Sequence, residues 1–134
     1  MPQGNVELVR AALTVFRETQ EVTEEFLAPH FVWDMRSWPV WPGQQVFHGR
    51  EGFTEFFAEW TDAYDEWTND FESFIDAGED RVVVTTVQHG RLRGSDSWVD
   101  LRAAFLYTVK DGLITRAEVY ESAEQALEAA GLRE

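Results

Sequence analysis

The 134-residue chain contains no cysteine, and it has only 11 lysines and arginines against 25 aspartates and glutamates. Without cysteine it can form no disulfide, thiol nucleophile or thiolate metal site. The formal net charge of −14 would repel phosphate backbones and anionic lipids, so we expect neither a nucleic-acid nor a membrane partner. No apolar run reaches the roughly 20 residues that cross a bilayer, and the polar start MPQGN is unlike a secretory signal. We therefore expect a cytoplasmic protein.

Core-forming residues are plentiful, since 44% of the chain is hydrophobic and 14% aromatic. A chain of this length and composition is expected to form a single domain over residues 1–134. The acids are unevenly placed, because 11 of the 25 fall between Glu51 and Asp80, where there is no lysine or arginine. We interpret this stretch as the solvated side of a helix and the turns after it.

Apolar spacings of three and four predict a helix over 5–18, with Asn5 as its N-cap, and a second over about 21–28, ended by Pro29. A third helix should follow residue 48 and continue to Trp67, because its aromatic residues keep helical spacing. β-Branched runs and turn signals predict a loop at 37–49 and strands at 31–35, 71–76, 81–93, 98–109 and 113–120. A closing helix capped by Ser122 should end at Gly131. This order predicts an α+β fold, with helices on one face of a curved sheet that contains a four-strand antiparallel meander.

Several phrases then carry a resemblance to a known family. The turn HGREG, the segment IDAGEDRVVV, the ending KDGLITRAEVYES and the tail QALEAAGL resemble the SnoaL-like group of the nuclear transport factor 2-like superfamily, over nearly the whole chain. The resemblance implies a cone-shaped fold with a pocket, in which a curved antiparallel sheet wraps around three N-terminal helices and a short C-terminal helix follows. That superfamily includes cyclases, ketosteroid isomerases, epoxide hydrolases, dehydratases and binding modules, so the fold alone selects no reaction.

Asp34 is the sharpest candidate for a catalytic group. It lies on a predicted strand between Trp33 and Met35, where burial would raise the pKa of its carboxyl and suit it to accept and return a proton. The resemblance places the proton-shuttling aspartate of the isomerases at the same point. His48, at the end of the tryptophan-rich loop, is a candidate acid or hydrogen-bond donor at the pocket mouth, and a plain turn histidine is the alternative.

An isomerase also needs donors that stabilise the enolate oxygen. Where the resemblance implies a tyrosine, this chain has Leu13 or Phe16, and the nearest match for the second donor is Asp100, so ketosteroid isomerisation is disfavoured. Asp100 and Arg102 share a strand face and can pair, with Glu118 on the adjacent strand. Such a set could orient a water against an epoxide, and a structural ion pair is the alternative.

Eleven of the 19 aromatic residues lie between Phe31 and Trp67. They favour a pocket for a flat, hydrophobic, polycyclic ligand, and the alternative is that they fill the core or a dimer interface. The candidate pocket residues, taken from this cluster and from the later strands, are Trp33, Trp38, Trp41, Phe57, Trp60, Arg102, Tyr107, Glu118 and Tyr120.

The three histidines lack metal-ligand spacing, and no phosphate-binding or dinucleotide motif occurs, so we expect no metal and no cofactor. The leading hypothesis is a protein that binds a small apolar, polyketide-like molecule and acts on it by acid–base isomerisation, cyclisation or dehydration. The alternatives are a non-catalytic ligand-binding or dimerisation module and an epoxide hydrolase-like enzyme. In every case we expect a homodimer through the sheet, whose outer face is rich in valine, leucine and alanine.

Overall fold

A computed structural model describes residues 2–19, 25–38, 45–78 and 80–131. Its elements follow one another as α1 (Pro2–Thr19), β1 (Leu27–Asp34), β2 (Val46–His48), α2 (Gly49–Thr61), β3 (Tyr64–Asp76), β4 (Arg81–Leu92), β5 (Trp98–Lys110), β6 (Leu113–Tyr120) and α3 (Ala123–Ala129). The predicted α+β class is confirmed. None of the described helices is long and apolar enough to cross a membrane.

The six strands form one curved, open sheet in the order β2-β1-β6-β5-β4-β3. The meander from β3 to β6 is antiparallel, as the sequence predicts. The prediction of a fully antiparallel sheet was wrong, because β1 lies parallel to β6. These two strands are far apart in the chain, so no hairpin forces them to run in opposite directions.

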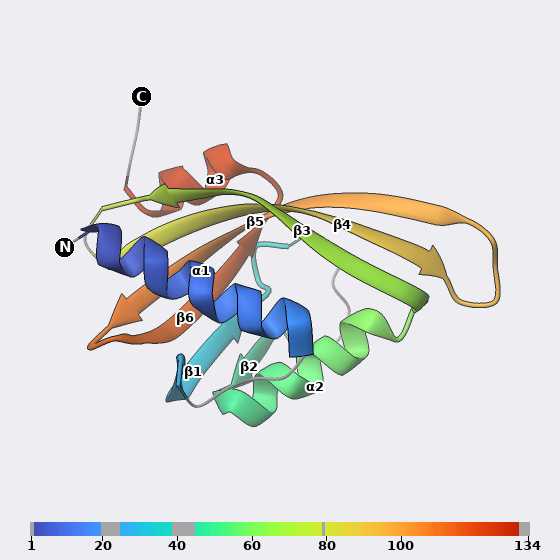
Figure 1. Cartoon of the computed structure of the whole chain (residues 1–134), viewed down its shortest axis with the longest axis horizontal. Coiled ribbons are helices and arrows are strands. Elements are labelled where there is room, and N and C mark those ends of the chain that lie inside the picture. The colour runs from blue at the N-terminus through green and yellow to red at the C-terminus, as the bar shows by residue number, and fades with distance from the viewer. Residues whose placement is uncertain (1, 20–24, 39–44, 79, 132–134) are drawn as a thin grey trace.

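Two hydrophobic clusters lie on opposite faces of the sheet. On the inner face, α1 and α2 pack against the large side chains of β1, β4, β5 and β6. On the outer face, the short helix α3 packs through Ala126 against Val83, Ala104 and Leu106. Figure 1 shows α1 crossing in front of the sheet and α3 lying at the opposite side. The prediction that helices cover only one face was therefore wrong.

The second predicted helix, over 21–28, falls partly on residues 21–24, which lie outside the described residues. At its end the prediction was wrong, because Leu27 and Ala28 begin β1. The Leu27 carbonyl accepts two hydrogen bonds from the Arg50 guanidinium, at 3.0 and 2.8 Å. The neighbouring Phe26 carbonyl accepts from the Ile114 amide of β6 at 2.7 Å. These long-range bonds hold an extended backbone where local spacing favours a helix.

The third helix ends at Thr61, six residues before the predicted Trp67. Tyr64 and Trp67 instead lie on β3, where the pairing with β4 shifts between Tyr64 and Glu66. A bulge adds one residue to a strand, so residues three apart can face the same side. That spacing is also helical, which is why the sequence pattern did not show the boundary.

The remaining boundaries follow from local signals. Helix α1 begins at Pro2 rather than after Asn5, since proline suits the first helical position. The turn between β5 and β6 has positive φ at Asp111 and Gly112, the geometry of a tight hairpin. The Ser122 side chain accepts from the Gln125 amide and caps α3, as predicted.

Candidate functional site

A pocket lies on the inner face, between α1, α2 and the sheet. It holds about 540 Å³ of free space, counting the part that opens to solvent, and eleven of its 17 lining residues are aromatic. The lining consists of Leu13, Phe16, Trp33, Met35, Trp38, Phe53, Phe56, Phe57, Trp60, Trp67, Asn69, Phe71, Gln88, Ala103, Phe105, Tyr107 and Val119. None of these described residues is charged, so the pocket suits a ligand with large apolar faces.

Two periodicities bring the rings together. Helix α2 supplies four rings at helical spacing, Phe53, Phe56, Phe57 and Trp60. Strand alternation turns Trp33 of β1 and Phe105 of β5 to the same side. The Trp33 ring centroid lies 4.9 Å from those of Phe53 and Phe56 and 5.6 Å from that of Phe105. Contacts of this kind hold flat walls in place.

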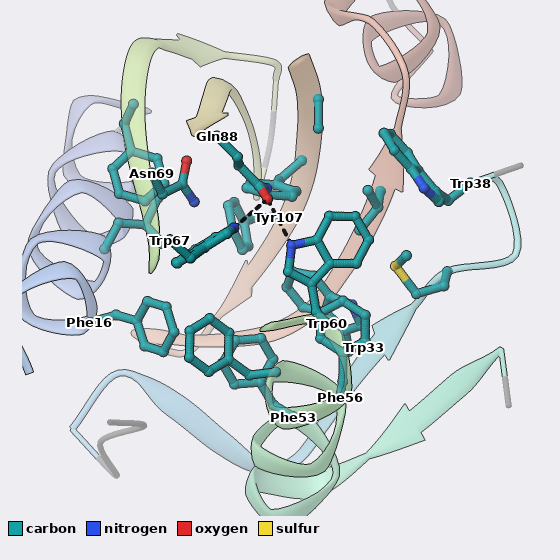
Figure 2. A pocket seen from close by; sticks show the side chains of 17 residues that line it. Phe16, Trp33, Trp38, Phe53, Phe56, Trp60, Trp67, Asn69, Gln88 and Tyr107 are labelled. Carbon is teal, nitrogen blue, oxygen red and sulfur yellow. Dashed lines mark hydrogen bonds between the residues drawn. The ribbon is translucent and has the colours of Figure 1, made fainter. Parts of the chain in front are cut away.

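Gln88 is the central polar group of the pocket. It lies on β4 opposite Asn69 of β3 and is only 7% exposed. The indole N–H groups of Trp60 and Trp67 both donate to its Oε1, at 2.8 and 3.1 Å. Figure 2 shows the Gln88 oxygen between the two indoles. The amide is therefore held from α2 and β3 at once.

Other polar groups also belong to this lining, and one of them is Asn69, whose Oδ1 accepts a hydrogen bond from the Thr86 hydroxyl. Burial raises the pKa of the Tyr107 hydroxyl well above its ordinary value, so at neutral pH this group stays protonated and acts as a donor rather than a base. The Trp33 indole N–H is buried and has no hydrogen-bond partner among the described residues. Together with Gln88, these groups leave the pocket better supplied with donors than with acceptors.

A second hollow of about 440 Å³, again counting open space, adjoins the first. The two share Leu13, Phe16, Trp33, Phe53 and Tyr107. The second extends toward Phe31 and Ile114 and is likewise apolar. The inner face thus offers more than one apolar compartment along the same wall.

The structure places Asp34 away from this pocket. It follows Trp33 on β1, so alternation turns it toward the outer face, where it is 5% exposed. Its carboxylate accepts from the Arg36 guanidinium at 2.8, 3.0 and 3.2 Å, from the Arg36 backbone amide at 2.9 Å, and from Arg116. The carboxylate is thus buried but fully paired.

The predicted rise in the pKa of Asp34 was wrong. Burial does act to raise this pKa, but the hydrogen bonds of Arg36 and the positive charges of Arg36 and Arg116 outweigh it and lower the pKa below its ordinary value. A carboxylate with a lowered pKa is a weak base. Geometry and charge therefore both favour a structural ion pair at this position.

Glu118 and Tyr120 lie on the same side as Asp34. The Arg116 Nε donates to Glu118 at 3.3 Å, and the Tyr120 hydroxyl donates to Glu118 at 2.6 Å. Burial and the neighbouring Glu118 raise the pKa of Tyr120 to about 12. Neither residue is among those lining the aromatic pocket; Tyr120 instead borders an open depression beside α3.

Asp100 and Arg102 do not form the predicted pair. Asp100 binds His89 at 2.7 Å, whereas Arg102 binds Glu72 at 2.9 Å. Both lie on exposed parts of β5, and Glu118 belongs to the separate Asp34 network. The set proposed to orient water against an epoxide is therefore not assembled, because each member has a different partner.

His48 is exposed and ends β2 just before α2, outside the pocket lining. Trp41 lies outside the described residues. Of the predicted pocket residues, Trp33, Trp38, Phe57, Trp60 and Tyr107 do line the pocket. Among the described residues there is no cluster of histidines and acids that could hold a metal ion.

Sequence reasoning missed Gln88, Asn69 and Trp67 as pocket residues. Gln88 carried a usable signal, since it is a lone amide in the β-branched run VVVTTVQ and alternates with the apolar residues that face the core. Asn69 and Trp67 carried none, because Trp67 was assigned to the preceding helix and residues 68–70 were assigned to no element, whereas both residues lie on β3.

The comparisons with solved structures agree with this fold. The crystal structure of TerC co-crystallised with polyporic acid is similar over 96% of this chain and 99% of TerC, with 23% identity and a TM-score of 0.70. A protein from Jannaschia sp. CCS1 assigned as a SnoaL-like polyketide cyclase matches over 98% of this chain and 94% of its own, with 21% identity and a TM-score of 0.69. An NTF2-like protein from Anabaena variabilis matches over 90% of each chain, with 16% identity and a TM-score of 0.71.

The profile of the SnoaL-like domain matches residues 9–117. The chain therefore belongs to the SnoaL-like domain family, and the resemblance drawn from its sequence phrases is confirmed. No curated protein matches the sequence. These three structural neighbours are each less than 25% identical to this chain, so their similarity concerns the fold. The class of ligand must be argued from the chemistry of the pocket itself.

Proposed function

We propose that this protein binds a flat, largely apolar small molecule in the aromatic pocket. The observation that carries the proposal is the lining itself, in which eleven of 17 residues are aromatic and no described residue is charged. The ring centroids of neighbouring aromatic residues lie 4.9–5.6 Å apart. These rings present surfaces against which a planar ligand can stack. Binding of polyporic acid by TerC, which has a similar fold, supports the same class of occupant.

The proposal assigns no reaction to the pocket. Acid–base isomerisation, cyclisation or dehydration needs a base beside the ligand, and among the described lining residues the only titratable side chain is the Tyr107 phenol, whose pKa burial raises. Asp34 is held by two arginines on the other face. The geometry therefore supports the ligand-binding hypothesis better than the catalytic one.

Titration with fluorene, followed by tryptophan fluorescence, tests the proposal. Ala103→Leu would place three more carbons into the pocket floor, and we expect it to weaken fluorene binding at least about tenfold. Ala63→Leu, the same change at an exposed site between α2 and β3, should leave binding unchanged. Urea unfolding of each variant checks that the fold is retained. Equal binding by both variants would place the ligand outside this pocket.

We also propose a homodimer, as the sequence analysis expected, though for a different reason. The apolar outer-face residues Val83, Ala104 and Leu106 are already covered by α3. Among the described residues, the exposed large hydrophobic side chains are instead Leu92, Trp98 and Val99, at the far end of the β4–β5 hairpin. Light scattering after size exclusion should give twice the 15.5 kDa chain mass and, for Trp98→Ser, a larger monomer fraction. A wild-type monomer would overturn this proposal.

A further inference from the structure

The Gln88 amide is held in one orientation by its neighbours. An indole N–H can only donate a hydrogen bond, and a carboxamide accepts only through its oxygen. Since both Trp60 and Trp67 donate to Gln88, the oxygen must face them. The amide nitrogen therefore points to the other side of the side chain and cannot exchange places with the oxygen without losing both bonds.

The amide nitrogen has two N–H groups, and it is not one of the fully buried unpaired atoms of the described residues, so it keeps some accessible surface at the pocket wall. Gln88 is 7% exposed and lines the pocket, yet no described residue accepts a hydrogen bond from its Nε2. A donor that is accessible from a pocket can be satisfied there by a water molecule or by a polar atom of a ligand. The nitrogen is consequently a donor without an acceptor among the described residues, at the wall of a mainly aromatic pocket.

We infer that Gln88 selects and orients the ligand by donating a hydrogen bond from Nε2 to an oxygen on the ligand. This inference rests on the proposed binding function and narrows it to flat aromatic molecules that carry a carbonyl or phenolate-type oxygen. The apolar faces of such a molecule stack between the rings of α2 and the sheet, and its oxygen lies against the Gln88 amide. Trp60 and Trp67 act as positioning residues, because they fix the orientation of the Gln88 amide without needing to contact the ligand oxygen.

The chemistry of the wall agrees with this ligand class. The Tyr107 hydroxyl and the Trp33 indole N–H, two other polar groups of the lining, are also donors, and the Asn69 oxygen already accepts from the Thr86 hydroxyl. A ligand that is itself a donor would find no free acceptor at Gln88, whose oxygen already receives two bonds. Carbonyl-bearing rings are therefore favoured over amines or simple hydrocarbons.

A matched pair of probes tests the inference. Fluorene and 9-fluorenone are planar tricyclic molecules of nearly equal size, and only the second has a carbonyl oxygen. We expect the wild-type protein to bind fluorenone about 2- to 10-fold more tightly, the range of one net hydrogen bond. Gln88→Glu keeps an acceptor for both indoles but removes the N–H donors, so the ratio of the two affinities should fall to one or below.

Two further variants complete the experiment. Gln88→Met, of similar volume and without either polar end, should also abolish the preference, and it replaces the glutamate variant if that one fails to fold. Gln125→Glu makes the same chemical change on α3, on the other face of the sheet, and should keep the wild-type ratio.

The outcomes separate the two proposals. If fluorene binds but the wild-type protein shows no preference for fluorenone, or if the preference survives both Gln88 variants, the role of Gln88 is wrong while the binding function stands. If neither probe binds the wild-type protein, the binding function fails and the role of Gln88 fails with it. Loss of the preference in the Gln88 variants alone supports the inference.

Discussion

Asp34 shows how partners from distant parts of the chain decide the chemistry of one residue. The sequence around it, VWDM, predicts burial, and the carboxyl is indeed buried. It does not indicate Arg116, which is 82 residues away in the chain and reaches Asp34 from β6. Two guanidinium groups convert a candidate base into one end of an ion-pair network.

We predict that Asp34→Asn destabilises the protein by about 1.5–3 kcal/mol at pH 7, because it weakens several charge-assisted hydrogen bonds to a buried group. Urea unfolding measures this change in the free energy of unfolding. Asp100→Asn, which removes an exposed carboxylate, is the control and should cost less than about 1 kcal/mol. Fluorene binding should be unaffected by either variant, and a loss of binding in Asp34→Asn alone would contradict the placement of Asp34 outside the pocket.

The same variant has a predicted pH dependence. The folded-state pKa of Asp34 is lowered from its ordinary value of 3.8, so its contribution to stability is complete above that value and is lost as the pH falls through the folded-state pKa. The difference in stability between wild type and Asp34→Asn should therefore narrow below about pH 3.8. A difference that stays constant down to pH 2 would show that the carboxylate is not paired.

His89 offers a second test among single residues. Its Nδ1 lies 2.7 Å from Asp100 and its Nε2 lies 3.1 Å from Asp70. The hydrogen bond to Asp100, with the charge of Asp70, raises the pKa of His89 above its ordinary 6.5. The stability this provides is present below pH 6.5 and lost as the pH rises through the folded-state pKa. In an NMR titration, Asp100→Asn should lower the pKa of His89, whereas Asp96→Asn in the neighbouring turn should not.

At the scale of elements, boundaries were predictable where local chemistry sets them. The Asp111–Gly112 turn and the Ser122 cap act within four residues, and both β6 and α3 are found where the sequence places them. The end of α2 was not predictable from spacing, because a bulge near Tyr64 gives β3 the same three-residue interval as a helix. The start of β1 depends on Arg50 and β6, which no local pattern contains.

Helix α3 has only seven residues, too few to be stable without its cap and its packing on the outer face. Ser122→Ala removes the hydroxyl that accepts a hydrogen bond from the backbone N–H of Gln125. We therefore predict a loss of about 1 kcal/mol in the free energy of unfolding. Chemical denaturation measures it. Ser97, whose backbone groups bond within the β4–β5 turn, provides Ser97→Ala as the control, and equal effects of the two changes would argue against capping.

At the scale of the whole molecule, the sequence predicted the fold class and the aromatic character of the pocket better than its polar groups. Large aromatic residues such as Trp33, Trp38 and Trp60 can be predicted to line the space between the sheet and α2, because their side chains have large apolar surfaces to bury. Polar site residues depend on which face a strand presents. Trp33 and Asp34 are neighbours in the sequence, yet Trp33 points to the inner face and Asp34 to the outer face. Sequence reasoning did not resolve which of the two residues faces the pocket.

The charge of −14 takes no part in the pocket, whose described lining is uncharged. Most of the arginine side chains that the structure pairs bind acids at the edges or on the outer face, as Arg17 binds Asp70 and Arg93 binds Asp62. The aromatic pocket thus contains no charged side chain among its described residues, in keeping with the proposal that it binds a flat apolar molecule.

The tryptophan indole N–H signals in a ¹⁵N-correlation NMR spectrum test this claim most directly. On addition of 9-fluorenone, the signals of the pocket residues Trp33, Trp60 and Trp67 should shift, while that of Trp98, 54% exposed at the hairpin, should stay in place. Tryptophan-to-phenylalanine variants assign each signal. A spectrum in which only the Trp98 signal shifts, or in which no signal shifts at the highest soluble fluorenone concentration, would contradict the proposed binding of a flat molecule in the pocket.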